Sequence, residues 1–162
     1  MRNIKKYDEF LNENINPEIQ TIDESELEEI LSEGNTPILI IRDIGHGHTN
    51  AIKEAAKGLG FDFKHLNLPI MDITDLIGLP HGDNYYPPSI LPNKDVDGAG
   101  IILFDEIDKA NKVVRDGCLK LAIDKELNNY TLPDNWRCVF TASNADFLIP
   151  RIEQRFDIFK LI

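Results

Sequence analysis

The sequence has only two cysteines and fewer basic than acidic residues, and each shortage excludes a class of protein. Cys118 and Cys138 are too few for a disulfide framework and fit a reducing cytosol as buried free thiols. Lysine and arginine number 17 against 28 aspartates and glutamates, a net charge of −11, so we expect neither nucleic acid nor an anionic membrane as partner. No signal peptide or membrane-spanning apolar run is present. These shortages predict a soluble cytoplasmic protein.

What remains is the composition of one globular domain of 162 residues, 42% of them hydrophobic. Buried apolar runs predict strands over 37–41 and 101–104, and the alternation of apolar and polar residues predicts another over 61–66. Further strands are predicted over 137–142 and 158–162. Helical patterns fall between them, over 27–31, 51–58, 72–77, 110–127 and 152–155. The alternation predicts a three-layer α/β domain, with a five-stranded parallel sheet flanked by helices.

The segments outside these elements differ in character. Residues 1–20 form an N-terminal extension whose apolar side chains predict a short amphipathic helix over 1–15. The core domain then runs over 21–162, and Asp23 and Glu26 have the spacing of a capping box. Residues 78–99 are rich in Pro, Gly, Asn and Asp, which predicts a long irregular loop of the kind that usually carries function.

The most informative stretch is the apolar strand 101–104, which is followed directly by Asp105 and Glu106. The carboxyl end of a parallel strand is where open α/β sheets bind ligands. Two carboxylates there suit nucleotide hydrolysis, because Asp105 can hold Mg²⁺ while Glu106 orients a water. If Asp105 and Glu106 are considered without other motifs, they can also be two solvated residues at the end of a strand.

The segment after strand 37–41 has the order of a phosphate-binding loop, strand then glycines then helix. Gly45 and Gly47 let the backbone approach a phosphate, and the Thr49 hydroxyl can ligate Mg²⁺. His48 stands where the pattern G-x-x-x-x-G-K-[ST] has lysine. A free histidine has a pKa near 6.5 and is mostly neutral at pH 7. Losing one charge-assisted contact costs about 1.5–3 kcal/mol.

Two other residues depart from the same pattern. Arg42 replaces its first glycine, and Asp43 places a negative charge where phosphate would lie. An ordinary glycine-containing turn therefore explains the loop about as well, if the loop is taken alone.

Further polar residues follow the last two predicted strands. Asn144 can reach a water between Glu106 and a terminal phosphate, or can simply be a turn residue. Arg155 can stabilise phosphoryl charge in a neighbouring subunit, with Arg151 as the fallback, or can form a surface ion pair with Glu153 or Asp157.

The histidines leave one minor alternative open. His46 and His48 form a His-x-His pair that, with Asp105, could hold a transition metal. His65 and His81 show no ligand spacing, so we expect them to be structural or exposed.

These motifs together resemble the AAA+ ATPases, in particular the MoxR-like and dynein-related branch. Residues 103–108 are similar to a Walker B motif, Asn144 to sensor 1, and Arg155 with Phe156 to an arginine finger. Further similar segments are 75–80, which follows the second strand, 86–88 and 91–92, which approach Walker B, and 132–137, which looks like the hairpin before the sensor strand. Residues 5–13 are similar to N-termini common among tailed-phage proteins.

The resemblance implies a P-loop NTPase-like (AAA+) fold, a ring oligomer and ATP bound between subunits. It implies Gly45, Gly47 and His48 at the phosphates, and Thr49 and Asp105 on Mg²⁺. It implies catalytic roles for Glu106 at the attacking water, Asn144 at the terminal phosphate and Arg155 at the neighbour's ATP. The helical lid that follows the fifth strand in this family is expected to be absent here.

Two functions stay open at this point. The first is an ATPase that binds Mg-ATP, hydrolyses it weakly and remodels a protein client. The second is an inactive AAA+ pseudo-ATPase that serves as a scaffold or, together with partner subunits, as a subunit of a larger assembly. The acid pair favours the first, and the altered loop with the absent lid favours the second.

Overall fold

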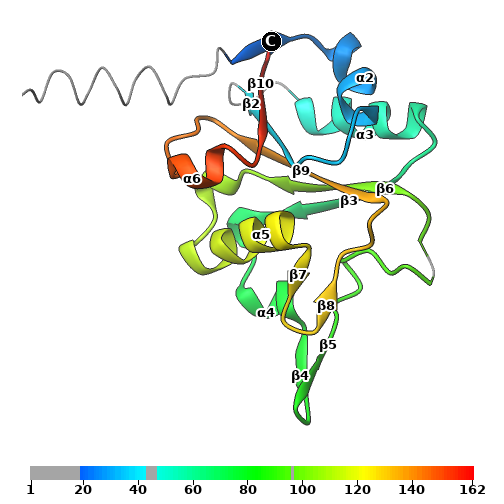
Figure 1. Ribbon diagram of the computed structural model, residues 1–162, viewed down its shortest axis with the longest axis vertical. Helices are drawn as coiled ribbons and strands as arrows, with labels where there is room; N and C mark the ends of the chain where they lie inside the picture. The colour runs from blue at the N-terminus through cyan, green and yellow to red at the C-terminus, as the bar shows by residue number, and fades with distance from the viewer. Residues whose placement is uncertain (1–18, 43–46, 96) are drawn as a thin grey trace, which may run out of the picture.

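The computed structural model describes residues 19–42, 47–95 and 97–162 (Figure 1). The helix predicted over 1–15 lies outside these residues, as do Asp43, Gly45 and His46 of the loop. None of the helices in the described ranges combines the length and the apolar character that crossing a membrane requires.

A six-stranded sheet forms the centre of the domain, in the order β1-β10-β2-β9-β6-β3 with every neighbouring pair parallel. The five predicted strands are confirmed within one residue at each end. Their bounds are β2 Ile38–Arg42, β3 Asp62–Asn67, β6 Gly100–Asp105, β9 Trp136–Ala142 and β10 Asp157–Leu161. β6 and β9 are buried along their whole length. Residues 101–104 of β6 are all apolar, as a strand covered on both faces requires, while the polar side chains Arg137 and Thr141 of β9 are hydrogen-bonded.

The predicted count of five strands is wrong because a sixth strand, β1 (Gln20–Ile22), pairs with β10 at one edge. Three residues are too few to show an alternating pattern. Of the three, only Ile22 is buried, so the hydrophobic signal of this strand is a single residue.

Helices cover both faces of the sheet and enclose two apolar cores (Figure 1). On one face lie α2 (Leu27–Ser32) and α3 (His48–Gly58), and on the other lie α4 (Ile73–Ile77) and α5 (Lys112–Asp124). The capping box forms as predicted, since the Asp23 N–H donates to Glu26 Oε2 at 2.9 Å. The other helical segments of the described ranges are short: η1 Glu24–Glu26, η2 Leu68–Ile70, η3 Ile107–Lys109 and α6 Pro150–Glu153.

The prediction of one long irregular loop over 78–99 is wrong in its first part. There β4 (Leu79–His81) and β5 (Asn84–Tyr86) form an antiparallel hairpin that extends away from the body of the domain (Figure 1). The turn residues Gly82 and Asp83, together with Pro80 inside β4, gave these two short strands the composition of a loop.

The helix predicted over 110–127 is also too long. Lys125 adopts a left-handed conformation (φ 61°) that ends α5. A second small hairpin follows, made of β7 (Glu126–Leu127) and β8 (Tyr130–Thr131). It lies just before 132–137, the segment that looked like a hairpin in the sequence.

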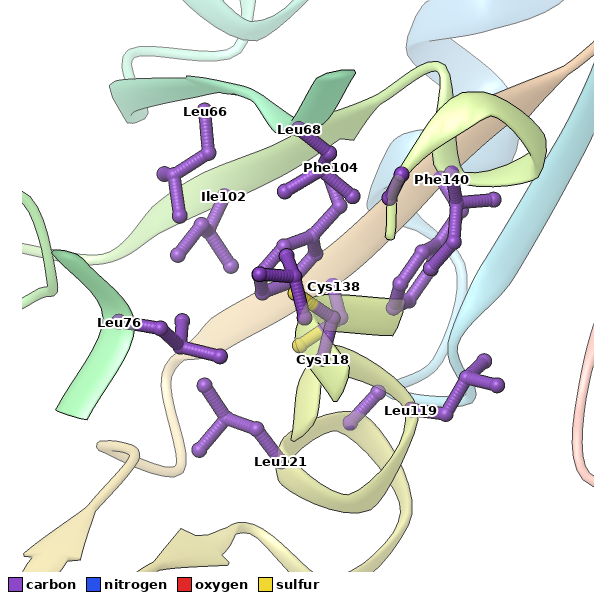
Figure 2. Close-up of a cluster of buried hydrophobic side chains, with 14 of the residues drawn as sticks. Leu66, Leu68, Leu76, Ile102, Phe104, Cys118, Leu119, Leu121, Cys138 and Phe140 are labelled. Atoms are coloured by element: carbon purple, nitrogen blue, oxygen red, sulfur yellow. The ribbon is translucent and has the colours of Figure 1, made fainter. Parts of the chain in front are cut away.

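The core beneath β6 and β9 is built around stacked aromatic rings (Figure 2). Phe104 stacks on Phe140 with ring centroids 4.7 Å apart, and Phe140 meets the edge of Phe156 at 5.3 Å. Cys118 and Cys138 are free and buried in the same core. Burial raises the pKa of both thiols, that of Cys138 to about 12, so neither carries the thiolate that a nucleophile needs.

Candidate functional site

Asp105, the last residue of β6, lies at the centre of a cluster of polar side chains. Its carboxylate is only 10% exposed, and both of its oxygens accept hydrogen bonds. Oδ1 accepts from Arg42 Nη2 at 2.9 Å and from the Thr141 hydroxyl. Oδ2 is bonded to Thr49 Oγ1 at 3.0 Å and to His65 Nε2 at 2.9 Å. Four elements of the chain thus converge on one carboxylate.

Sheet order explains this convergence. β2, β9, β6 and β3 are successive neighbours, and parallel strands bring their carboxyl ends to one edge. Arg42 ends β2, Thr141 is next to last in β9, and His65 lies in the second half of β3. Thr49 comes from the first turn of α3, which starts at the same edge.

The environment of Asp105 sets its charge. Burial alone would raise its pKa, but hydrogen bonds from His65 and Thr141, the positive charge of Arg42 and a hydrogen bond from Thr49 outweigh that effect. Together they hold the pKa of Asp105 well below its usual range. Asp105 is therefore an anion at neutral pH, with its charge balanced inside the protein.

Glu106 follows Asp105 in a left-handed backbone conformation (φ 58°), which is uncommon for a residue with a side chain. Its N–H donates to Thr141 Oγ1 at 3.0 Å. Its carboxylate, one-third exposed, accepts from Lys109 Nζ at 2.7 Å. Lys109 thus holds the Glu106 side chain at the left-handed turn that follows β6.

Of the loop predicted to bind phosphate, the described part begins at Gly47, which is exposed and left-handed (φ 64°) and serves as the N-cap of α3. His48 lies buried in the first turn of α3, with its Nδ1 3.7 Å from Glu24 Oε1. Its ring therefore faces η1. The cation beside Asp105 is Arg42 rather than His48.

A hollow of about 380 Å³ opens beside Gly47, between η1 with α2 on one side and α3 on the other. Its lining is rich in carboxylates and small residues: Glu24, Ser25, Glu28, Gly47, Asn50, Ala51, Glu54 and Ala55. Carboxylates accept hydrogen bonds from amino and hydroxyl groups. The hollow is thus suited to a neutral polar ring or a sugar rather than to phosphate.

Asn144 and Arg155 are both exposed, and within the described residues neither has a hydrogen bond to the acid pair. Asn144 Oδ1 instead accepts from the Asp146 N–H at 3.0 Å, in a turn after β9. Neighbouring Ser143 is tied to η3, because its N–H donates to Asp108 Oδ2 at 3.1 Å. The roles predicted for Asn144 and Arg155 stay predictions.

Three residues of the cluster had no predicted role in it: Arg42, His65 and Thr141. Thr141 had a sequence signal, since it is a polar residue inside the apolar strand β9 and is fully buried. Such a residue needs a hydrogen-bond partner, and here it has two. His65 and Arg42 had no comparable signal, because their roles depend on which strands are neighbours.

The transition-metal alternative gains no support from the part of the site that can be described. Across residues 19–42, 47–95 and 97–162, no group of three or more His, Cys, Asp or Glu side chains is placed to hold a metal ion. His46 lies outside these ranges, and His48 faces Glu24.

No family model and no curated protein matches the sequence. Among solved structures the chain is similar to NtrX from Brucella abortus in complex with ADP, with a TM-score of 0.57, 13% identity, and coverage of 84% of this chain and 34% of that one. For NtrX in complex with ATP the TM-score is 0.57 and the identity 14%, with coverage of 85% of this chain and 34% of that one. For a further NtrX structure the TM-score is 0.56 and the identity 13%, with coverage of 96% of this chain and 40% of that one.

This likeness, added to the parallel sheet and the order of β2, loop and α3, decides the fold. The chain has an α/β fold with a parallel six-stranded sheet flanked by helices, consistent with a P-loop NTPase-like domain. It spans well under half of the NtrX chains, so the likeness concerns this domain alone. Thr49 and Asp105 meet at the carboxyl edge of the strands, the edge where open α/β sheets in general bind ligands.

Proposed function

We propose that the protein is an AAA+-type nucleotide-binding module that binds ATP or ADP at the Asp105 edge of the sheet. The observation that carries the proposal is the contact between Thr49 Oγ1 and Asp105 Oδ2 at 3.0 Å. It joins the first turn of α3 to the end of β6, as a phosphate site at a strand edge requires. The likeness to NtrX, which was crystallised with ADP and with ATP, supports it.

The parts of a nucleotide have matching places around this contact. The first N–H groups of a helix lack intrahelical partners and attract anions, so phosphates fit at the start of α3 beside Gly47. Base or ribose fits the adjacent hollow, where Glu24 and Glu28 can accept from amino or hydroxyl groups.

A glycine pair of equal backbone conformation tests this site. Gly47 (φ 64°) and Gly60 (φ 73°) both have open space where a side chain would go, but Gly47 lies at the start of α3 and Gly60 just after its end. Gly47→Val should weaken ATP and ADP binding about tenfold or more, because a β-branched residue disfavours this conformation and changes the loop. We expect micromolar binding by the unaltered protein in isothermal titration calorimetry.

Gly60→Val is the matched control. We expect it to lose a similar amount of thermal stability and to bind nucleotide with unchanged affinity. Equal weakening in both variants would point to general destabilisation and count against the site at Gly47. If the unaltered protein binds neither ATP nor ADP, the proposed function is wrong.

Turnover is the finer part of the proposal, and we propose that hydrolysis is slow. Lys109 holds Glu106, the residue expected to orient water, and Arg42 holds Asp105. We expect kcat well below the ~1 s⁻¹ at the low end of typical enzymes. Lys109→Ala should raise it severalfold by freeing Glu106, and Glu106→Gln should abolish it, both measured by phosphate release.

The same assay decides between the two functions. Release that is absent in every variant, with nucleotide still bound, would establish the non-hydrolysing alternative. A protein partner belongs to both proposals, since Ile70, Leu79 and Tyr86 are 80%, 69% and 60% exposed around the β4–β5 hairpin. Ring assembly with further subunits would appear as a mass increase on adding ATP in light scattering, and an unchanged mass would exclude it.

A further inference from the structure

The site differs from a metal-binding acid pair because hydrogen bonds from the protein already fill the acceptor positions of the Asp105 carboxylate. An ionised carboxylate offers about four acceptor positions, and the four hydrogen bonds to Asp105 use all of them. Mg²⁺ binds carboxylate oxygens at about 2.0–2.1 Å in near-octahedral geometry. With donors on both oxygens, the described arrangement has no free position for the ion, so the residues as arranged do not fit Mg²⁺.

Arg42 is the donor that matters most in this respect. Its guanidinium is 13% exposed, and arginine remains charged throughout the physiological pH range. A dication beside Asp105 would lie next to this fixed positive charge in a region of low solvent access, where repulsion is strong. Mg²⁺ and Arg42 therefore compete for the same carboxylate.

The position of Arg42 in the sheet shows why a long cationic side chain is needed. β9 lies between β2 and β6, so the backbones of Arg42 and Asp105 are separated by two strand spacings, or about 10 Å. Arg42 spans this distance past Thr141, which contacts the same oxygen of Asp105. Glycine, which the phosphate-loop pattern has at position 42, could not do so.

We infer that Arg42 takes the place of the divalent cation at this site, so that the protein binds nucleotide without Mg²⁺. The guanidinium balances Asp105 and supplies the fixed positive charge that the loop lacks, with histidine at position 48. This inference rests on the proposed function for its nucleotide part. Its metal part concerns only Arg42 and Asp105.

Mn²⁺ tests the metal part without nucleotide, through the electron paramagnetic resonance signal of the free ion. The unaltered protein and Arg42→Lys, which keeps the charge, should show no site that depends on Asp105. Arg42→Gln should gain a Mn²⁺ site about tenfold tighter than any in the unaltered protein. The double variant Arg42→Gln, Asp105→Asn should lose it again, which separates this site from weak binding elsewhere on an acidic surface.

Calorimetry of ATP in EDTA and in excess Mg²⁺ tests the nucleotide part, with affinities expected to agree within about twofold. Three results would overturn the inference. The first is an ATP affinity that rises tenfold with Mg²⁺, and the second is a Mn²⁺ site in the unaltered protein that Asp105→Asn removes. The third is an Arg42→Gln variant that gains no Mn²⁺ site. If ATP does not bind at all, the proposed function fails, while the Mn²⁺ result still decides whether Arg42 excludes the metal. Thermal unfolding of each variant verifies that it is folded.

Discussion

Replacing Thr141 by valine should lower the free energy of unfolding by about 3 kcal/mol, although the two side chains have nearly the same shape. Thr141 is fully buried, and its hydroxyl donates to Asp105 while it accepts from the Glu106 N–H. Valine removes a hydrogen bond to a charged group, worth about 1.5–3 kcal/mol, and leaves a backbone N–H without that partner at a further cost of about 1–3 kcal/mol. Urea unfolding followed by circular dichroism measures the loss.

Thr141→Ser is the control, because it keeps the hydroxyl and removes one buried methyl, a loss of about 1 kcal/mol. A valine variant as stable as the serine variant would show that the hydroxyl contributes little. The same pair reports on the site, since only valine releases the turn that holds Glu106 in its left-handed conformation.

Phe104→Ala should have the largest effect on stability, a loss of about 4 kcal/mol. The ring is completely buried between β6 and α5 and stacks on Phe140 at 4.7 Å (Figure 2). Alanine leaves a cavity that this close-packed core can fill only in part. Because Phe104 precedes Asp105, the cavity also loosens the strand that positions the acid pair.

Urea unfolding again provides the measurement, and Phe104→Leu the control. Leucine keeps most of the volume but loses the aromatic stack, which is worth about 0.5–1.5 kcal/mol. It should therefore cost less than half as much as alanine. A loss below about 2 kcal/mol for alanine would mean that the core collapses around the missing ring.

The sequence was sufficient to predict those elements whose signal is local. The run 101–104 is apolar throughout because its strand is covered on both faces, and 137–142 is mostly apolar, interrupted by Arg137 and Thr141. β1 and the two hairpins were missed or misplaced because strands of two or three residues show no periodicity. In the two hairpins, turn residues such as Gly82 and Asn128 also obscure the strand pattern.

For the site, the sequence predicted residues that lie directly at strand ends or in the loop. Thr49 and Asp105 meet as expected, because parallel strands share an edge. Arg42 and His65 were not predicted as partners of Asp105, since their contacts follow from strand order. Strand order is a tertiary property that local pattern does not encode. His48 was expected at the phosphates, and its orientation toward Glu24 depends on how η1 packs on α3.

The order of the strands also has a consequence for how the chain folds. β2 ends at Arg42, yet both of its neighbours, β9 and β10, begin only at Trp136 and Asp157. Within the described residues, β1 joins the sheet through β10 alone. While the polypeptide emerges from the ribosome, β1 and β2 must therefore wait for the last strands before their edges are covered. Such a high contact order predicts slow folding and a nascent chain that benefits from chaperones.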